Sequence, residues 1–411
     1  MAGKVVLVGA LDTKGEEYLF VKNILENQNI DTITVNTGVL DEPLYTPEIS
    51  SDAVARAGGS DLNTLVKAND RGKAVAVMTK GAKVIMEQLI DQEEVAGAFG
   101  MGGTAGTTVA SSAMQAINVG IPKILVSTVA SGNTRPYVGV KDIMMMYSVI
   151  DIAGINTLSS KILSNAAYSL VGMVQANKNG SVVNSDKPMI GMTMFGVTTP
   201  CCTQVRNKLE DLGYDVLVFH ATGSGGMAME ELIRAGFIKG VVDATTTELA
   251  DELVGGVFSA GPNRLLAAGE CGVPQVVSVG ALDMVNFGPP ETVPDQFTDR
   301  QFYQHNPTTT LMRTTVQENK ELGRQIGEKL SKSTSPVVVV FPKGGVSMLD
   351  KDGNDFDGPE QREALLLGMK ETIRTDIPFI ELEEDINDSV IANKMAETIH
   401  ELMKTTNVKE V

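Results

Sequence analysis

The sequence contains no tryptophan, and aromatic residues make up only 5% of its 411 positions. A binding surface of stacked aromatic rings, such as those that hold single-stranded nucleic acids, therefore has little material here. Cysteine is also scarce, with Cys201, Cys202 and Cys271 as the three in the chain. An odd number with two adjacent members is no disulfide framework, so the chain fits a reducing compartment and we expect a cytoplasmic protein.

The chain also lacks the signals of membrane insertion and export. No apolar stretch reaches the ~18 residues that a membrane-spanning helix needs, and charge follows the N-terminus too soon for a signal peptide. The nearest candidate, DIMMMYSVIDIAG at residues 142–154, is short and carries Asp142 and Asp151; we expect it to form a buried helix. A net charge of -17 repels nucleic acids and anionic membranes, so we expect neither as a partner.

What the chain does have is a regular alternation of strand and helix signals. Val5–Val8 is an apolar run, and a helical pattern over Gly15–Leu25 follows it. Val95–Phe99 and Lys123–Ser127 are further apolar runs, separated by a helical pattern over Thr107–Ile117. Strands that alternate with helices predict an α/β fold in which helices cover a parallel sheet.

The same order of elements begins twice. KVVLVGALDTKGEEYLF starts at Lys4 and KPMIGMTMFGVTTPCCT starts at Lys187, and each leads from a strand through a turn into a helix. A polar stretch rich in Gly, Asn and Ser, at residues 175–188, is typical of a linker. We therefore predict two tandem Rossmann-like, three-layer α/β/α domains with mostly parallel sheets: a nucleotide-binding domain at residues 1–180 and a second domain at residues 187–411.

The sharpest candidate for a ligand loop is GAFGMGGTAGTT, at residues 97–108. Gly100, Gly102 and Ala105 fit the G-x-G-x-x-G/A spacing between a strand and a helix. Glycines let the backbone approach a phosphate, and the N-terminus of a helix favours negative charge. A tight turn without a ligand is the alternative. As phosphate-binding residues of this loop we predict Gly102, Gly103, Thr104, Gly106 and Thr107.

Two familiar nucleotide sites do not fit the chain. The strand after this loop ends in LVSTVASGN, without the acidic residue that holds the ribose of NAD. The P-loop pattern G-x-x-x-x-G-K-[ST] does not occur. A nucleotide would therefore have to be held by the glycine loop in another way.

Other residues of the first half should share this edge of the sheet. Asp12, Thr13 and Lys14 follow the first strand: Lys14 suits a phosphate, Thr13 is a donor, and Asp12 could hold Mg²⁺ or a ribose hydroxyl. The alternative is that Asp12 or Thr13 caps the helix. Thr79 and Lys80 follow another possible strand, unless they form a surface turn, and Thr128 follows the strand that ends at Ser127.

The second half has candidates for catalysis. His220 follows a strand and precedes a glycine-rich turn, and a helix with Glu230 comes next. Asp243 follows another strand, and Arg264 lies near a helix start. His220, Glu230, Asp243 and Arg264 could form an anion site with carboxylates for acid–base chemistry. A hydrogen-bonded loop histidine is the alternative for His220.

Metal-binding patterns are weak. The histidines are far apart and make no zinc spacing with the cysteines. DKDGNDFDG, at residues 350–358, resembles a calcium loop, but its glycine comes too early and Gln361 stands where the closing glutamate should be. We expect a solvated polar loop there.

Four motifs carry a family resemblance: GALDTKGEE, GMGGTAGTT, HATGSGGMAMEELI and DATTTELADELVGGVFSAGPNRL. They resemble the uncharacterised bacterial and plant proteins that share the nucleotide-binding domain of the tomato mosaic virus resistance protein, over nearly the whole chain. The resemblance implies two Rossmann-like subdomains, ATP binding and self-association as homodimers. Plant members continue into a barrel-like domain that resembles phosphoenolpyruvate-utilising enzymes, and the resemblance implies that a separate protein of that kind could be a partner.

We therefore expect an ATP-binding protein, with Mg²⁺ accompanying the nucleotide. Two alternatives stay open. One is an enzyme that acts on a phosphorylated or carboxylated metabolite, at the sheet edge of the second domain or in the cleft between the domains. The other is a non-catalytic regulatory or scaffold subunit that uses ATP as a conformational ligand.

Overall fold

The computed structural model describes residues 3–180 and 186–406 of the chain. The chain divides into two compact units, with the boundary between residues 184 and 185; they are called unit 1 and unit 2 below. Of the predicted linker at residues 175–188, the part up to Lys178 belongs to a helix of unit 1, and residues 181–185 lie outside the described residues.

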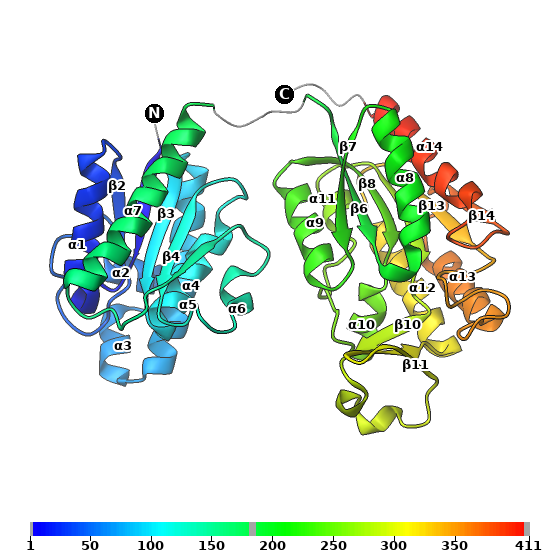
Figure 1. Cartoon of the computed structure of the whole chain (residues 1–411), viewed down its shortest axis with the longest axis horizontal. Coiled ribbons are helices and arrows are strands. Elements are labelled where there is room, and N and C mark those ends of the chain that lie inside the picture. The colour runs from blue at the N-terminus through cyan, green and yellow to red at the C-terminus, as the bar shows by residue number, and fades with distance from the viewer. Residues whose placement is uncertain (1–2, 181–185, 407–411) are drawn as a thin grey trace. The chain divides into compact units, whose positions relative to one another are not determined.

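Unit 1 is a five-stranded parallel sheet in the order β2-β1-β3-β4-β5, with helices on both faces (Figure 1). Helices α1 and α7 pack on one face, and α2, α4 and α5 pack on the other. The central strands read as continuous apolar runs because both faces of the sheet are buried. The elements are β1 Lys4–Gly9, α1 Leu11–Asn27, β2 Thr32–Asn36, α2 Ser51–Ala57, α3 Leu62–Ala68, α4 Arg71–Asp91, β3 Val95–Gly102, α5 Thr104–Ala116, β4 Lys123–Ser127, α6 Arg135–Val138, β5 Met144–Tyr147 and α7 Thr157–Lys178.

Unit 2 has a six-stranded parallel sheet in the order β14-β13-β9-β8-β6-β7 and a three-stranded antiparallel sheet in the order β10-β12-β11. Helices α8 and α14 cover one face of the large sheet, and α10, α12 and α13 pack on the other. The elements are β6 Met189–Met194, η1 Gly196–Thr198, α8 Thr199–Asp211, β7 Asp215–His220, α9 Ser224–Arg234, β8 Ile238–Thr245, α10 Glu248–Val254, α11 Ala267–Glu270, β9 Gln275–Gly280, β10 Met284–Phe287, η2 Pro290–Thr292, η3 Asp295–Phe297, β11 Phe302–Asn306, β12 Thr309–Arg313, α12 Val316–Ser331, β13 Val337–Pro342, α13 Pro359–Thr372, β14 Phe379–Leu382 and α14 Ser389–Thr405.

The two units share the topology of their central strands. The order β7-β6-β8-β9 in unit 2 repeats the order β2-β1-β3-β4 in unit 1, with the first strand of each unit in the second place. Each unit is thus a three-layer α/β/α structure with a mostly parallel sheet, as the sequence predicted. Among the described residues, no helix is long and apolar enough to cross a membrane.

The local predictions for unit 1 are wrong in two places and partly right in a third. Helix α1 begins at Leu11, so Asp12 and Thr13 lie in its first turn, but Lys14 has non-helical backbone angles (φ -130°, ψ 21°) and kinks the chain just before the predicted helix at Gly15–Leu25. Helix α4 is continuous, so Thr79 and Lys80 lie in mid-helix and follow no strand. Residues 142–154 form the edge strand β5 and a loop in place of a buried helix.

The glycine at position 81 explains the error in α4. Gly81 in the motif MTKGAK suggested a turn, but a Cβ there would lie 1.9 Å from the carbonyl oxygen of Val54 in α2. The missing side chain lets α2 and α4 approach closely, which is a packing requirement and not a break in the helix. The apolar residues Ala74, Met78 and Ala82 recur every four positions, as a buried helix face requires.

Candidate ligand site at the carboxyl edge of the first sheet

A cavity of about 690 Å³ lies in unit 1, next to the ends of three strands. Its walls come from the segments that follow β1, β2 and β3 and from α3 and α4. In a sheet of this order the connections leave in opposite directions on either side of the β1–β3 pair, and ligands bind outside the carboxyl ends at that point. The lining residues are Ala10, Asp12, Thr13, Thr37, Gly38, Val39, Leu40, Leu65, Val66, Asn69, Asp70, Arg71, Ala74, Val75, Met78, Ala105, Gly106 and Val109.

Three helices present their N-termini to this cavity. Asp12 and Thr13 belong to the first turn of α1, Arg71 is the first residue of α4, and Gly106 lies in the first turn of α5. Helices α4 and α5 have 21 and 13 residues, long enough for a developed dipole, whereas non-helical backbone angles at Lys14 kink α1 after its first turn. The first N–H groups of a helix have no partner within it, and they attract anions. Asp70 already caps α4 and lines the cavity together with Asp12, so the uncapped start of α5 is the helix end that most clearly favours a negatively charged ligand.

Arg71 adds a full positive charge at the same place. Its side chain is exposed and lines the cavity, and within residues 3–180 and 186–406 no hydrogen bond or ion pair engages its guanidinium. Arg71 is not among the ligand-binding residues that the sequence predicts. The signal that could have found it is Asp70, whose side chain accepts the N–H of Lys73 and caps α4 at 3.0 Å; an aspartate just before an apolar helical pattern marks a helix start.

Asp12 has one carboxylate oxygen in use and one without a partner. Oδ2 accepts the backbone N–H of Leu40 at 2.9 Å, whereas the buried Oδ1 has no hydrogen-bond partner in the described part of the chain. Gly38 makes room for this carboxylate, since a Cβ at position 38 would lie 2.4 Å from the Asp12 carboxyl carbon. An unpartnered carboxylate oxygen beside an anion-favouring cavity fits Mg²⁺, which binds proteins through one or two carboxylates and the phosphates of its ligand.

Of the residues predicted to bind the nucleotide, Asp12, Thr13 and Gly106 line the cavity. Lys14 does not line the cavity, and its ammonium group donates to the carbonyl oxygen of Ile152. Thr107 is fully buried, and its hydroxyl lies 2.6 Å from that of Ser127. The predicted residues that are not part of the lining are Lys14, Thr79, Lys80, Gly102, Gly103, Thr104, Thr107 and Thr128.

The glycines of the loop serve packing as well as access. Gly102 ends β3 with φ +158°, and a Cβ there would lie 3.0 Å from the Cα atom of Gly106. Gly100 is buried within β3, where a Cβ would lie 2.5 Å from the side chain of Ala110 in α5. The close fit of the strand against the helix places the N-terminus of α5 at the cavity.

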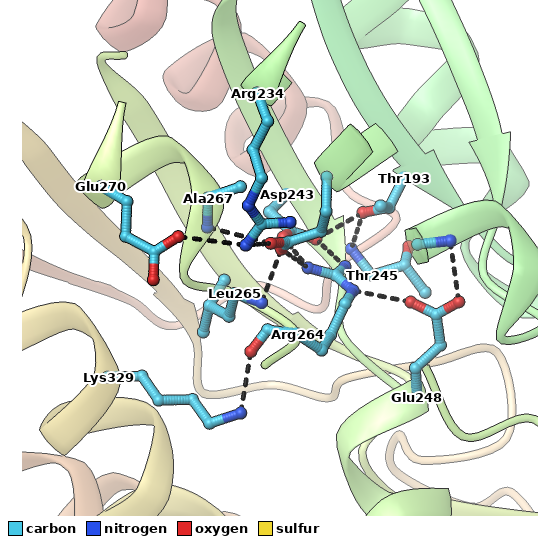
Figure 2. A network of polar contacts seen from close by, with 12 residues as sticks. Thr193, Arg234, Asp243, Thr245, Glu248, Arg264, Leu265, Ala267, Glu270 and Lys329 are labelled. Carbon is cyan, nitrogen blue, oxygen red and sulfur yellow. Dashed lines mark hydrogen bonds and ion pairs between the residues drawn. The ribbon is translucent and has the colours of Figure 1, made fainter. Parts of the chain in front are cut away.

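In unit 2, three of the four catalytic candidates form a buried ionic network (Figure 2). Arg264 is 1% exposed, and its two terminal nitrogens donate to Asp243 at 2.5 and 2.6 Å. Its Nε donates to Glu248 at 2.7 Å, and Nη1 lies 3.5 Å from Glu230. Thr193 also donates to Asp243, at 2.7 Å. Asp243, Glu230 and Arg264 are thus engaged with one another and with the backbone, which leaves Arg264 no open face for a ligand.

The glycine-rich turn before α9 already holds an anion, and that anion is part of the protein. Glu248 Oε1 accepts the N–H groups of Gly223 at 2.7 Å and of Gly226 at 3.0 Å. This carboxylate occupies the place at the helix N-terminus that the sequence suggested for a ligand. Burial raises the pKa of Glu248, and the nearby Arg264 opposes the rise. His220 is outside the network: it is exposed at the end of β7, with its ring 5.4 Å from that of Phe195.

The loop at residues 350–358 is exposed over residues 352–355, as we expected of a solvated loop, but its first residue is not. Asp350 is fully buried and accepts from Arg313 at 3.0 Å and from Arg362 at 2.8 Å. Burial and the neighbouring Asp350 raise the pKa of Asp283 to about 7. Across the residues that the structure covers, no group of three or more His, Cys, Asp or Glu side chains is placed to hold a metal ion.

Comparison with known proteins gives the family but not its activity. The model of the uncharacterised protein family UPF0261 matches as an N-terminal domain at residues 3–179 and a C-terminal domain at residues 187–403. A UPF0261 protein of Clostridium tetani is 52% identical over 405 residues, which cover 98% of this chain and 100% of that protein. The ToMV resistance protein Tm-1(GCR237) of Solanum lycopersicum is 41% identical over 424 residues, which cover 97% of this chain and 56% of the tomato protein.

Among solved structures, UDP-N-acetylglucosamine 2-epimerase from Rickettsia bellii matches 98% of this chain and 97% of its own, at 9% identity and a TM-score of 0.23. A score this low carries no inference about activity. The two domain models and the relatives that match along nearly the entire sequence decide the classification: the chain belongs to the uncharacterised protein family UPF0261.

Proposed function

We propose that unit 1 binds a nucleotide, ATP together with Mg²⁺, in the cavity at the carboxyl edge of its sheet. The observation that carries the proposal is one cavity at the β1–β3 switch point that combines the uncapped N-terminus of α5 with the guanidinium of Arg71. Its volume of about 690 Å³ is in the range of small-molecule sites. The family resemblance carried by the motifs GALDTKGEE and GMGGTAGTT implies ATP binding, so ATP is the first ligand to test.

In this proposal, different lining residues contact different parts of the ligand. The amides at the start of α5, around Gly106, and the guanidinium of Arg71 contact the phosphates, because both offer donors and positive charge. Asp12 holds Mg²⁺, which offsets phosphate charge next to that carboxylate. The aliphatic side chains of the lining face the rest of the ligand.

Calorimetric titration with Mg-ATP tests the proposal. The wild-type protein should bind, and Arg71→Ala should weaken binding about tenfold or more, since a hydrogen bond to a charged group contributes ~1.5–3 kcal/mol. Lys73→Ala is the matched control: it removes the same charge two residues further along α4, from an exposed side chain outside the lining. It should change the affinity less than about twofold, as expected for a charge screened by solvent.

Two results would count against the proposal. Absence of binding heat at millimolar Mg-ATP, confirmed by an unchanged melting temperature, would refute the proposal that unit 1 binds ATP. Equal losses from Arg71→Ala and Lys73→Ala would mean that ATP responds to positive charge anywhere near the start of α4 and is not bound at this cavity.

A further inference from the structure

The cavity has a second chemical face, built from aliphatic side chains. Leu65, Met78 and Val109 are buried at 3%, 2% and 5% exposure, and all three line the cavity. Leu40 and Val66 line it too, but they are 70% and 51% exposed. Single exposed apolar residues are common on protein surfaces. These two stand out because they continue a buried apolar wall to the rim of a cavity whose other elements favour anions.

Leu40 and Val66 come from separate elements that meet at this cavity. Leu40 follows β2, and Val66 belongs to the short helix α3. The backbone N–H of Leu40 is bound to Asp12, the carboxylate beside the anion-favouring helix ends. The position of the apolar rim is therefore tied directly to the polar part of the cavity.

We propose that Leu40 and Val66 form an apolar clamp that covers the planar base of a phosphorylated ligand, so that the cavity selects nucleotides over bare polyphosphates. This inference rests on the proposed function, since it assumes that the phosphates occupy the helix ends. Ligand contact would remove from water two exposed apolar side chains of the lining, a favourable change roughly proportional to the apolar area covered. Aliphatic groups contact the face of a ring, which every base shares, so the clamp recognises the presence of a base.

The test compares Mg-ATP with Mg-tripolyphosphate, which carries the phosphates but no base. The wild-type protein should bind ATP more tightly than tripolyphosphate. Leu40→Ala and Val66→Ala should each lose about tenfold in ATP affinity, the lower end of what methylene groups contribute in apolar pockets, and keep the wild-type affinity for tripolyphosphate. Both positions are exposed, so the variants should keep the wild-type melting temperature.

Leu158→Ala is the matched control. Leu158 is 43% exposed in α7 of the same unit and is not part of the lining, so this variant should bind both ligands like the wild type. Wild-type ATP affinity in Leu40→Ala and Val66→Ala, or an equal loss of both ligands, would overturn the clamp. If tripolyphosphate binds the wild-type protein as tightly as ATP, the anion site is supported and the apolar clamp is refuted. If neither ligand binds, the proposed function itself is refuted.

Discussion

Replacement of Arg264 by methionine should destabilise unit 2 strongly. The change keeps an unbranched side chain of similar length but removes a guanidinium that binds Asp243 through two nitrogens, at 2.5 and 2.6 Å, and Glu248 through a third, at 2.7 Å. It leaves buried carboxylates without a counter-charge, with Asp243 and Glu248 at 1% and 0% exposure. Breaking one buried pair in this way costs ~3–5 kcal/mol, a large part of the ~5–15 kcal/mol that stabilises a typical domain.

Urea unfolding followed by circular dichroism would measure this loss, because the chain has no tryptophan for fluorescence. Arg234→Met is the control: this arginine also pairs with Glu230, but it is 39% exposed, so the change should cost less than ~1 kcal/mol. The loss in Arg264→Met should also shrink from pH 8 to pH 5. Without the arginine the buried carboxylates have raised pKa values, and taking up protons removes their charge. A loss below ~1 kcal/mol, or one that does not depend on pH, would refute the view that Arg264 holds these elements together.

Three further predictions concern both units. Gly103→Asp should weaken Mg-ATP binding at least tenfold in calorimetry, while the melting temperature stays equal or rises. An aspartate at the N-cap of α5 stabilises the helix but repels a phosphate. A lower melting temperature would contradict the assignment of Gly103 as the N-cap. Asp283 should make the free energy of unfolding fall between about pH 4 and pH 7. Burial and the neighbouring Asp350 raise the pKa of Asp283 in the folded protein to about 7, so the folded protein keeps a proton that the unfolded chain releases. Urea titrations should show that the free energy of unfolding falls less steeply with pH in Asp283→Asn, and an equal slope would exclude this residue as the cause. Lys123→Met should destabilise unit 1 by ~1–3 kcal/mol in thermal unfolding. The change removes a buried ammonium 2.7 Å from Asp142 and leaves two backbone carbonyl oxygens without a hydrogen-bond donor. Unchanged stability would show that the packing of the methionine compensates for these lost contacts.

The repeated α/β architecture was predictable because each buried strand carries its own signal. Runs such as Val5–Val8 and Ile124–Val126 are apolar throughout, as strands covered on both faces must be, and helical patterns separate them. The duplicated order of strands followed from the same local signals. The start of α1 and the course of α4 were predicted less well. Lys14 resembles a turn residue and does kink α1, whereas Gly81 resembles a turn residue but lies inside α4, where its packing against α2 explains it.

The site was predictable only where strand order alone brings residues together. Asp12, Thr13 and Gly106 follow strands that are neighbours in the sheet, so a parallel topology was enough to place them at one edge. Arg71 lies after two connecting helices, and no rule of strand order places it. The opposite error occurred in unit 2, where the glycine-rich turn was expected to take part in a ligand site for anions, although the carboxylate of Glu248 already occupies it.

That carboxylate also bears on how the two units differ in function. Both units have the same central strand order, and both bring glycine-rich turns and helix N-termini to the carboxyl edge of the sheet. In unit 2 the positive end of α9 and the guanidinium of Arg264 are neutralised by Glu248. In unit 1 the corresponding edge has a cavity of about 690 Å³ and a guanidinium, that of Arg71, without a partner among the described residues. An anion from outside would have to displace a buried carboxylate in unit 2, whereas in unit 1 it meets exposed charge. The same architecture therefore leaves an open, partly positive cavity in the first unit, as the proposed ligand site requires, and a neutralised buried network in the second.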